Sequence, residues 1–472
     1  MKNHRVAIRL LQILVAIASL HFPVSHWVRA EDRPNVLFIA VDDLRPWVGH
    51  LEGHPNAQTP HIDRLATRGV SFTRAYCAAP LCNPSRVSLL TGIAPHRSGV
   101  YGNRDRFREN LPDAITLMQR FRQAGYSVRG AGKIFHGTHA HDERSWDLYY
   151  TPPRSPRPAP LNRNEHLPQS AWVPWGALDC DDEAMFDGKN ANWIIAEIQR
   201  PHERPFFLAY GLTKPHLPWE APQKYFESHP LDTIELPPIK EDDVDDLPAF
   251  GQKLAREIYD PSATRDLGNP GGDHNNVVAN DQWSVAVQAY LATIHFADAQ
   301  IGRVLDALEE SGQADKTIVV LWGDHGWHLG EKQHWRKHAL WDVTTRTPLI
   351  ISLPGARNEG TQCHRPVSLI DVYPTLMDLC GLPKVDGLDG QSLTPLLDDP
   401  NAEWDVPVLM TYGYRNHAVQ TDQWRYIHYA DGGEELYDHS RDPNEWNNLA
   451  PLPQYQNTIR ELKRHLPESP ER

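Results

Sequence analysis

Short apolar segments alternate with helical segments along most of this chain, and this alternation limits the folds that it can adopt. The first apolar segment, residues 35–41, reads NVLFIAV, which is typical of a strand buried on both faces of a sheet. Further apolar segments lie at residues 127–130, 206–212, 317–322 and 348–353. Helical patterns lie at residues 60–68, 84–90, 115–124, 191–199, 283–308 and 369–379. The alternation predicts the α/β class, with a large, mostly parallel sheet flanked by helices.

The pattern changes near residue 400. Short strand-like segments follow at hairpin spacing, at residues 408–412, 418–421, 424–429 and 434–437, and a helical pattern covers residues 455–465. They predict a small C-terminal antiparallel sheet with a helix. We therefore expect a main domain over residues 31–400 and a small α+β subdomain over residues 401–472. Within the main domain, residues 214–280 are rich in Pro, Asp and Gly and predict long loops.

The first 30 residues have the pattern of a secretory signal. Three basic residues, Lys2, Arg5 and Arg9, precede an apolar run at residues 10–20, and Val28-Arg29-Ala30 offers a cleavage site. The run is shorter than the roughly 20 apolar residues that span a bilayer. We expect residues 1–30 to be removed and the protein to be exported, either periplasmic or secreted. A retained N-terminal anchor is the alternative, and no later segment has the pattern of a transmembrane helix.

The charge of the chain restricts its partners. The full chain has a net charge of −14, and residues 1–30 carry four basic residues and no acidic ones, so the mature chain would carry −18. Such a surface disfavours nucleic acid as a partner. If the substrate is an anion, the positive charge that binds it must be gathered in a pocket.

Acidic residues follow two of the predicted strands. Asp42 and Asp43 come directly after the first strand, and Asp324 with His325 follows the strand at 317–322. Ligands of parallel sheets gather at the carboxyl ends of strands, so these side chains can meet in one crevice. Carboxylate oxygens suit Ca²⁺ or Mg²⁺. Taken alone, the acidic pair could equally be part of a loop or a helix cap.

The segment around Cys82 reads CNPSRVSLLTG over residues 82–92. An isolated cysteine is more often a buried structural residue, but this longer motif resembles the signature of type I, formylglycine-dependent sulfatases of the alkaline-phosphatase-like superfamily. The resemblance implies that a formylglycine-generating enzyme oxidises Cys82 to an aldehyde, whose hydrate attacks sulfur. One hydroxyl of the hydrate becomes sulfated and the other then re-forms the carbonyl and expels sulfate, a route that a serine lacks. Residues 31–400 would be the catalytic domain.

The resemblance also implies a metal site. It assigns the ligands of one Ca²⁺ ion to Asp42, Asp43, the modified Cys82, Asp324 and His325. His325 stands where many members of the family carry Asn, and both residues can offer a neutral donor. The ion would keep the nucleophile ionised and polarise the sulfate oxygens.

Basic residues in three further motifs complete the expected catalytic group. Any one of them, taken singly, is most often a solvated surface residue. By resemblance, Arg86 orders the formylglycine, Lys133 and Lys337 bind the sulfate oxygens, and His136 assists the formylglycine hydroxyls. His216 is assigned as the general acid that protonates the leaving alcohol, a role that suits a pKa near neutral.

Further motifs indicate which branch of the family the chain resembles. Lys133 and His136 are three positions apart, whereas many sulfatases have this pair two apart, and the chain also contains VDDLRP, KPHLPW, DHGWHLGE and LYDHSRDPNE. The set is similar to the iduronate-2-sulfatase branch and its bacterial members, which implies a sulfated oligosaccharide or polysaccharide as substrate. Trp327 and Trp335 match substrate-side positions of that branch, and Trp219 is expected near the same rim, although packing in the core is an equal alternative. Residues 150–180 and 240–280 match no motif, so the sugar is not defined.

Two other functions fit the same motifs. The first is a formylglycine-dependent phosphonate or phosphodiester hydrolase, and the second is a catalytically silent protein that binds sulfated glycans. The cysteine count bears on the mechanism, because the chain has five cysteines and an exported protein with an odd number leaves one unpaired. If Cys82 is modified, four cysteines remain.

Cys363 and Cys380 are the first pair to consider for a disulfide, although the sequence does not fix the connectivity.

Overall fold

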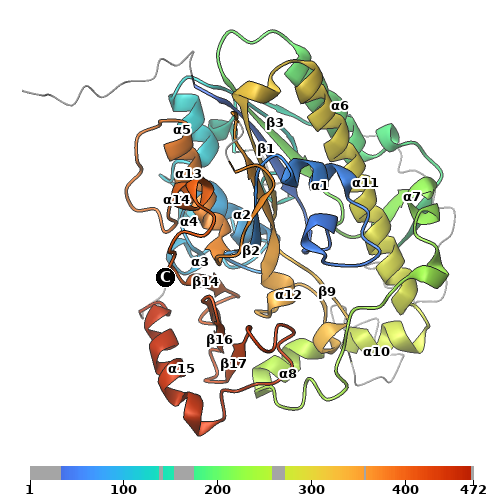
Figure 1. The fold of residues 1–472 in the computed structure, drawn as a ribbon, viewed down its shortest axis with the longest axis vertical. Coiled ribbons are helices and arrows are strands. Elements are labelled where there is room, and N and C mark those ends of the chain that lie inside the picture. Colours follow the sequence, from blue (N-terminus) through green and yellow to red (C-terminus); the bar gives the residue numbers. More distant parts are fainter. Residues whose placement is uncertain (1–32, 138–141, 154–174, 258–271, 356–357, 469–472) are drawn as a thin grey trace, which may run out of the picture.

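The computed structural model describes residues 33–137, 142–153, 175–257, 272–355 and 358–468 (Figure 1). The predicted signal at residues 1–30 lies outside the described residues, and so does part of the unmatched segment 150–180. Within the described ranges, no helix combines the length and the apolar character that crossing a membrane requires.

A large sheet forms the centre of the molecule, with the strand order β12-β2-β11-β8-β1-β6-β3-β4 and β13 paired to β2. All of these pairings are parallel except those of β11, which runs antiparallel to both β2 and β8. The predicted α/β class with a mostly parallel sheet is confirmed. The strands are β1 Asn35–Val41, β2 Val70–Tyr76, β3 Ser127–Gly132, β4 Leu148–Tyr150, β6 Phe206–Leu212, β8 Thr317–Gly323, β11 Arg346–Ser352, β12 Thr361–Cys363 and β13 Val367–Ser368.

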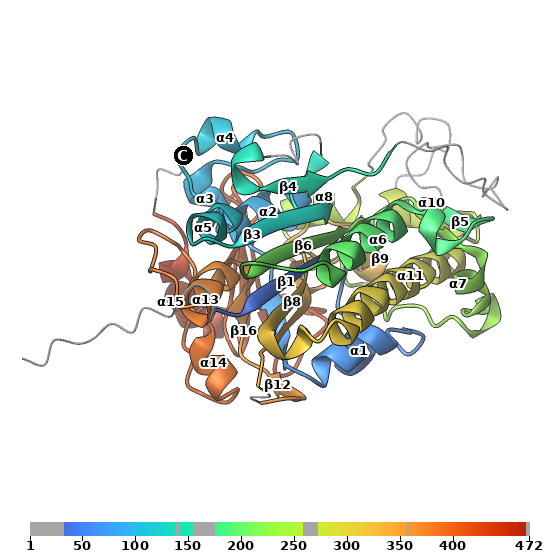
Figure 2. The same ribbon diagram turned by 90° about the horizontal axis from the view of Figure 1, so that it is seen from above.

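Helices cover both faces of this sheet, as Figure 2 shows. The residues of β1 alternate between two cores: Val36, Phe38 and Ala40 pack with one set of helices, and Leu37, Ile39 and Val41 pack with the other. The first set is α2 Cys82–Thr91, α5 Leu117–Gln123, α13 Val372–Leu379 and α14 Thr394–Asp398, and the second is α1 Pro60–Ala66, α6 Phe186–Gln199 and α11 Trp283–Glu310. Burial on both faces explains why β1 is continuously apolar.

Most of the predicted elements form within a few residues of their expected bounds. In α5, Thr116 and Gln119 form a capping box, which fixes the start of the helix at Leu117.

The prediction of long loops over residues 214–280 is wrong in part, because several short elements lie there: β7 Trp219–Pro222, α7 Gln223–Glu227, α8 Ala249–Ala255 and α10 Gly272–Ala279. Such elements are too short to show a period. The remaining elements are β5 Trp175–Leu178, α3 Pro95–Ser98, α4 Phe107–Asn110, β9 His328–Leu329, β10 Trp335–Arg336 and α12 Asp342–Thr345.

The predicted C-terminal antiparallel sheet is also confirmed, with its strands in sequential order. They are β14 Val408–Thr411, β15 His417–Gln420, β16 Trp424–His428 and β17 Glu434–Asp438, and α15 Gln456–Leu462 packs against them. The other face of this sheet shares an apolar core with residues 339–341 and with α8. From β16, the buried Arg425 donates to the carbonyl of Leu340 at 2.7 Å. The two regions are therefore packed together, and a domain boundary near residue 400 stays a prediction.

The suggested disulfide between Cys363 and Cys380 is wrong, because all five cysteines are free. Cys363 ends β12 at the edge of the large sheet, and Cys380 follows α13. Both are buried in the same apolar core. Burial raises the pKa of Cys363 and raises that of Cys380 to about 12, so these thiols act as small apolar side chains.

Gly211 allows the carboxyl ends of β3 and β6 to approach closely. A Cβ on Gly211 would lie 2.3 Å from the backbone carbonyl carbon and oxygen of Lys133. Backbone atoms cannot rotate away, so we expect Gly211→Ala to lower the free energy of unfolding by at least about 1–3 kcal/mol. Denaturant titration measures this. In the matched control Gly102→Ala, the nearest atoms lie at 3.6 Å, an ordinary contact; if both variants unfold at the wild-type midpoint, the close packing is not essential.

Candidate active site

Polar residues meet where β1 and β8 end. The two strands pair in parallel with Val41 opposite Gly323, so the residues that follow them become neighbours: Asp42, Asp43, Asp324 and His325. The backbone N–H of Asp43 donates to Oδ1 of Asp324 at 2.9 Å. All four of these residues are fully buried. The carboxyl edge of the sheet therefore brings together three carboxyl groups and an imidazole.

Helix α2 brings Cys82 and Arg86 to the same edge. Cys82 is the first residue of the helix, two positions earlier than the predicted start, and the i, i+4 spacing places both side chains on one helix face. Arg86 is fully buried and connects the two strand ends, because its Nε donates to Asp324 at 2.8 Å and its Nη2 donates to Asp42 at 3.1 Å. The Sγ atom of Cys82 lies 3.3 Å from Nε2 of His325.

Two lysines approach Cys82 from different loops. The Lys337 Nζ atom is 3.0 Å from the Cys82 Sγ atom and 2.7 Å from Oδ1 of Asp43. Lys133, directly after β3, pairs with Asp42, and its Nζ atom is 3.8 Å from the same sulfur. Burial and the Asp42 carboxylate raise the pKa of the Cys82 thiol, but the charges of the two lysines lower it further, so that it lies below its ordinary value. The sulfur thus occupies a position where negative charge is stabilised.

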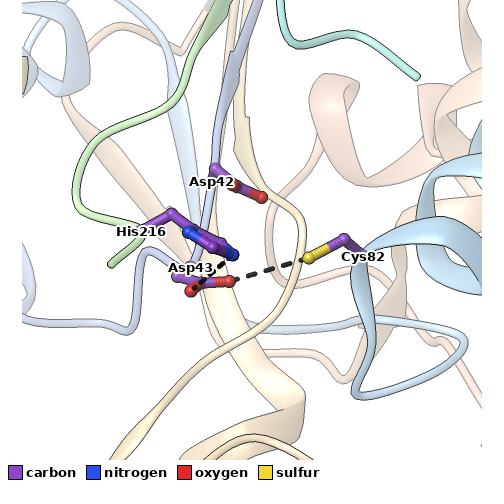
Figure 3. A group of neighbouring side chains, drawn as sticks. All are labelled: Asp42, Asp43, Cys82 and His216. Atoms are coloured by element: carbon purple, nitrogen blue, oxygen red, sulfur yellow. Dashed lines mark hydrogen bonds and ion pairs between the residues drawn. The ribbon is translucent and has the colours of Figure 1, made fainter. Parts of the chain in front are cut away.

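Two histidines lie beside this group. Figure 3 shows His216 pointing toward Asp43, with its Nε2 3.8 Å from Oδ2 of Asp43, while its Nδ1 lies 2.6 Å from the carbonyl of Leu217. His136 follows β3 and shares a cavity with Lys133 and His216. Burial and the charge of Lys133 lower the pKa of His136 to about 4. Burial likewise lowers the pKa of His216 to about 4, although Asp43 raises it in part.

Two residues that the sequence analysis did not consider hold the site loops in place. The Asp187 carboxylate, near the start of α6, accepts from the backbone N–H groups of Thr213 and Lys214 at 2.9 and 2.8 Å and so fixes the loop that carries His216. From α11, the Tyr290 hydroxyl donates to the backbone carbonyl of Asp43 at 2.6 Å. Asp43 has a φ of +58°, an uncommon conformation for a residue other than glycine. No local motif marks either residue.

The three tryptophans expected near the substrate are packed in the core. Trp327 and Trp335 expose 3% and 5% of their surface, and Trp219 exposes 1%. Trp327 lies beneath Lys337, whose Nζ is 5.3 Å from the ring centroid. The indole N–H of Trp335 donates to His274 at 3.1 Å. In this structure, their rings are covered by protein and offer little open face to a ligand.

The cluster has the chemistry of a site for a hard cation. Two overlapping groups each place four potential ligand atoms within 4.8 Å of one another: Asp42, Asp43, Cys82 and His216, and Asp43, Cys82, Asp324 and His325. Oδ2 of Asp43 is buried and has no hydrogen-bond partner, an arrangement that normally carries a cost. A cation beside this oxygen would satisfy it, and the carboxylate-rich set of ligands fits Ca²⁺ or Mg²⁺.

Two models of known protein families match this chain, and together they cover residues 34–472. Residues 34–382 match the sulfatase family, and residues 330–472 match the C-terminal region of N-sulphoglucosamine sulphohydrolase. A sulfatase of Formosa agariphila is 38% identical over 93% of this chain and 87% of its own length. The human iduronate 2-sulfatase is 31% identical over 74% of this chain and 70% of its own.

Solved structures show the same fold. One, described as in complex with its substrate D-glucosamine-2-N,6-O-disulfate, has a TM-score of 0.71 at 24% identity, over 92% of this chain and 96% of that one. A phosphonate monoester hydrolase from Silicibacter pomeroyi has a TM-score of 0.74 at 24% identity, over 92% and 94%. The fold is thus found in proteins named for two kinds of ester.

Proposed function

Because the chain belongs to the sulfatase family of sulfuric ester hydrolases, we propose that it removes O-sulfate groups from a sulfated saccharide by means of a formylglycine derived from Cys82. The observation that carries this proposal is the position of the Cys82 side chain. Its sulfur lies within reach of Lys337, Lys133 and His325, in a cluster that holds three buried carboxylates. A nucleophile at this position would meet both a cation site and a site for an anionic substrate.

Each residue of the cluster has a role in this proposal. Formylglycine would supply a hydrate with two hydroxyl groups on one carbon. Lys133 and Lys337 bind sulfate oxygens, and the N-terminus of the ten-residue helix α2 adds a favourable field for the anion. Arg86 keeps the two strand ends and the nucleophile in fixed relation. His136 assists the hydroxyls, and His216 donates the proton that the leaving alcohol needs. The pKa of His216, about 4 in the free protein, leaves the imidazole neutral near pH 7, so the negative charge of the bound ester has to raise that pKa for the role.

Asp42, Asp43, Asp324, His325 and the modified Cys82 would hold one Ca²⁺ ion, which supplies positive charge beside the nucleophile when it is bound. His216 also lies in one of the two candidate ligand groups. We keep it as the proton donor because it is partly exposed, with 30% of its side-chain surface accessible, whereas His325 is fully buried. A group that exchanges protons with substrate and solvent needs such access.

The saccharide part of the proposal draws on the relatives. The iduronate 2-sulfatase of the comparison is named for a sulfated sugar, and one solved structure is described with a sulfated glucosamine. We further propose that the protein is exported after loss of residues 1–30, that a formylglycine-generating enzyme modifies it, and that residues 31–400 form its catalytic domain.

Turnover of defined substrates tests the ester class. We expect release of sulfate from at least one monosulfated oligosaccharide of a panel, with a kcat/KM at least about tenfold above that for an aryl phosphodiester. The second candidate function, a phosphonate or phosphodiester hydrolase, is favoured by the Silicibacter pomeroyi structure, and the reverse preference would establish it. Intact mass of the peptide that contains Cys82 is measured in parallel. An unmodified thiol in an active preparation would refute the formylglycine mechanism, and glycan binding without turnover would indicate a silent binding protein.

A further inference from the structure

A cavity of about 330 Å³ opens beside the candidate active site. Its lining includes Lys133, His136 and His216, which also belong to the proposed catalytic group. Much of the remaining wall is aromatic and consists of Phe135, Tyr149, Tyr150 and Phe186. These residues come from the carboxyl ends of β3 and β4 and from the start of α6, so the cavity lies on the same edge of the sheet as Asp42 and Asp43. Lys133 and His216 are thus shared between this cavity and the cluster around Cys82.

Phe186 is the unusual residue of this wall. It exposes 46% of its surface, and it belongs to none of the apolar clusters formed by the described residues. An exposed phenylalanine leaves apolar surface in contact with water, which a ligand with an apolar face can cover at about 25 cal/mol per Å². Its backbone is well held, because the next residue, Asp187, is fixed to the loop that carries His216. The backbone that carries Phe186 is therefore linked to the loop of the proposed proton donor.

The other aromatic rings of the wall are held by contacts with the rest of the protein. The ring of Tyr150 stacks on Trp193 with centroids 5.2 Å apart and an interplanar angle of 3°, and the Tyr149 hydroxyl donates to the carbonyl of Gly132 at 2.5 Å. Phe135 stacks on Phe107 at 5.3 Å. These contacts fix the positions of the rings before any ligand binds, which reduces the entropy lost on binding.

We propose that this cavity is the binding site for the sugar ring that carries the sulfate, and that Phe186 determines specificity by covering an apolar face of that ring. The proposal rests on the proposed function and adds the residue that selects the alcohol. A pyranose has faces of C–H groups that pack on aromatic rings, and hydroxyls that the polar atoms of the cavity can bind. The polar side chains of the lining include Lys133, His136, Thr213 and His216 together with the two tyrosines. The volume lies at the lower end of the range of about 300–1,000 Å³ for small-molecule sites, which suits one or two rings.

Substitution of Phe186 tests the proposal. We expect Phe186→Ala to raise KM for the preferred saccharide sulfate about tenfold with a much smaller change in kcat, and Phe186→Trp to restore most of the affinity. The inhibition constant of inorganic sulfate should stay at the wild-type value, because this anion contacts the lysines and not the ring. Leu231→Ala is the matched control: Leu231 is 45% exposed and does not line the cavity, so its KM should not change.

The outcomes separate this inference from the proposed function. If Phe186→Ala leaves KM for every saccharide sulfate unchanged while the wild type turns them over, the sugar site is wrong and the sulfatase proposal stands. If the wild type hydrolyses no sulfate ester, the proposed function fails. In that case, calorimetric titration of sulfated monosaccharides tests the sugar site independently of turnover. A roughly tenfold lower affinity of Phe186→Ala than of the wild type supports the site, and equal affinity, or no binding to the wild type, overturns it.

Discussion

Replacing Cys82 by serine is expected to lower kcat for sulfate ester hydrolysis by at least about a thousandfold, while the protein stays folded. A serine hydroxyl cannot form the aldehyde hydrate, so a sulfated serine would have no second hydroxyl to expel sulfate. The fold should tolerate the change because the smaller Oγ atom replaces Sγ at the first turn of α2, among the polar groups of Lys337 and His325. Release of sulfate from the preferred saccharide measures the first effect and thermal unfolding the second.

Cys77→Ser is the matched control for this prediction. Cys77 is also fully buried, and its Sγ atom contacts the carbonyl of Thr344 at 4.0 Å and no catalytic side chain. We expect this variant to keep turnover within about twofold, with a loss of about 1 kcal/mol in the free energy of unfolding. If Cys82→Ser hydrolyses sulfate esters at the wild-type rate, the nucleophile lies elsewhere and the formylglycine proposal is refuted.

A helix or strand could be predicted from the sequence wherever its own residues form a clear pattern of apolar and polar side chains. The strand β1 is continuously apolar because both of its faces are covered, and its carboxyl end directs Asp42 and Asp43 to the edge where ligands gather. The strand β2 was missed because its two central residues, Thr73 and Arg74, are half-buried and polar. This breaks the apolar run on which the prediction depended.

The supports of the site could not be predicted, because they depend on contacts between distant segments. Asp187 and Tyr290 act on the backbone of loops that are far away in the sequence. The direction of Lys337 depends on its two neighbours, Arg336 and His338, which have φ values of 82° and 80°. Such left-handed conformations are rare for these residue types, so no pattern in the sequence indicates them. The burial of Trp327 and Trp335 likewise follows from packing against α11 and the large sheet.

The carboxyl groups and the Arg and Lys side chains of the site are equal in number. Asp42, Asp43 and Asp324 face Arg86, Lys133 and Lys337. A sulfate ester adds a negative charge to this group, inside a protein whose net charge is −14. Burial lowers the pKa of the neighbouring His325, but Asp324 raises it further, to about 9, so His325 adds positive charge, and a divalent cation would add more beside the anion. In the proposed site, Oδ2 of Asp43, which has no hydrogen-bond partner, is the atom that would hold such a cation.

We expect Asp43→Asn to lower the affinity for Ca²⁺ at least about a hundredfold, and to destabilise the metal-free protein because the buried Lys337 loses its charged partner. The Asn carbonyl can replace Oδ1 opposite Lys337, at 2.7 Å in the native protein, and the amide NH₂ then takes the place of Oδ2. Oδ2 has no hydrogen-bond partner and lies 3.8 Å from Nε2 of His216, so no hydrogen bond is lost, but an N–H group faces the cation site where an anionic oxygen stood. Calorimetric titration of Ca²⁺ into chelator-treated full-length protein measures the affinity.

Thermal unfolding provides a readout that does not depend on turnover. Ca²⁺ should raise the Tm of the wild type, because a ligand that binds only the folded state stabilises it, and the Tm of Asp43→Asn should not respond. Asp306→Asn is the control: this carboxylate is 48% exposed and pairs with Arg64 on the surface at 2.6 Å, so its Ca²⁺ affinity should equal that of the wild type. Native affinity in Asp43→Asn would remove Asp43 from the metal site. The proposed cation site would then have to rest on Asp42, Asp324 and His325.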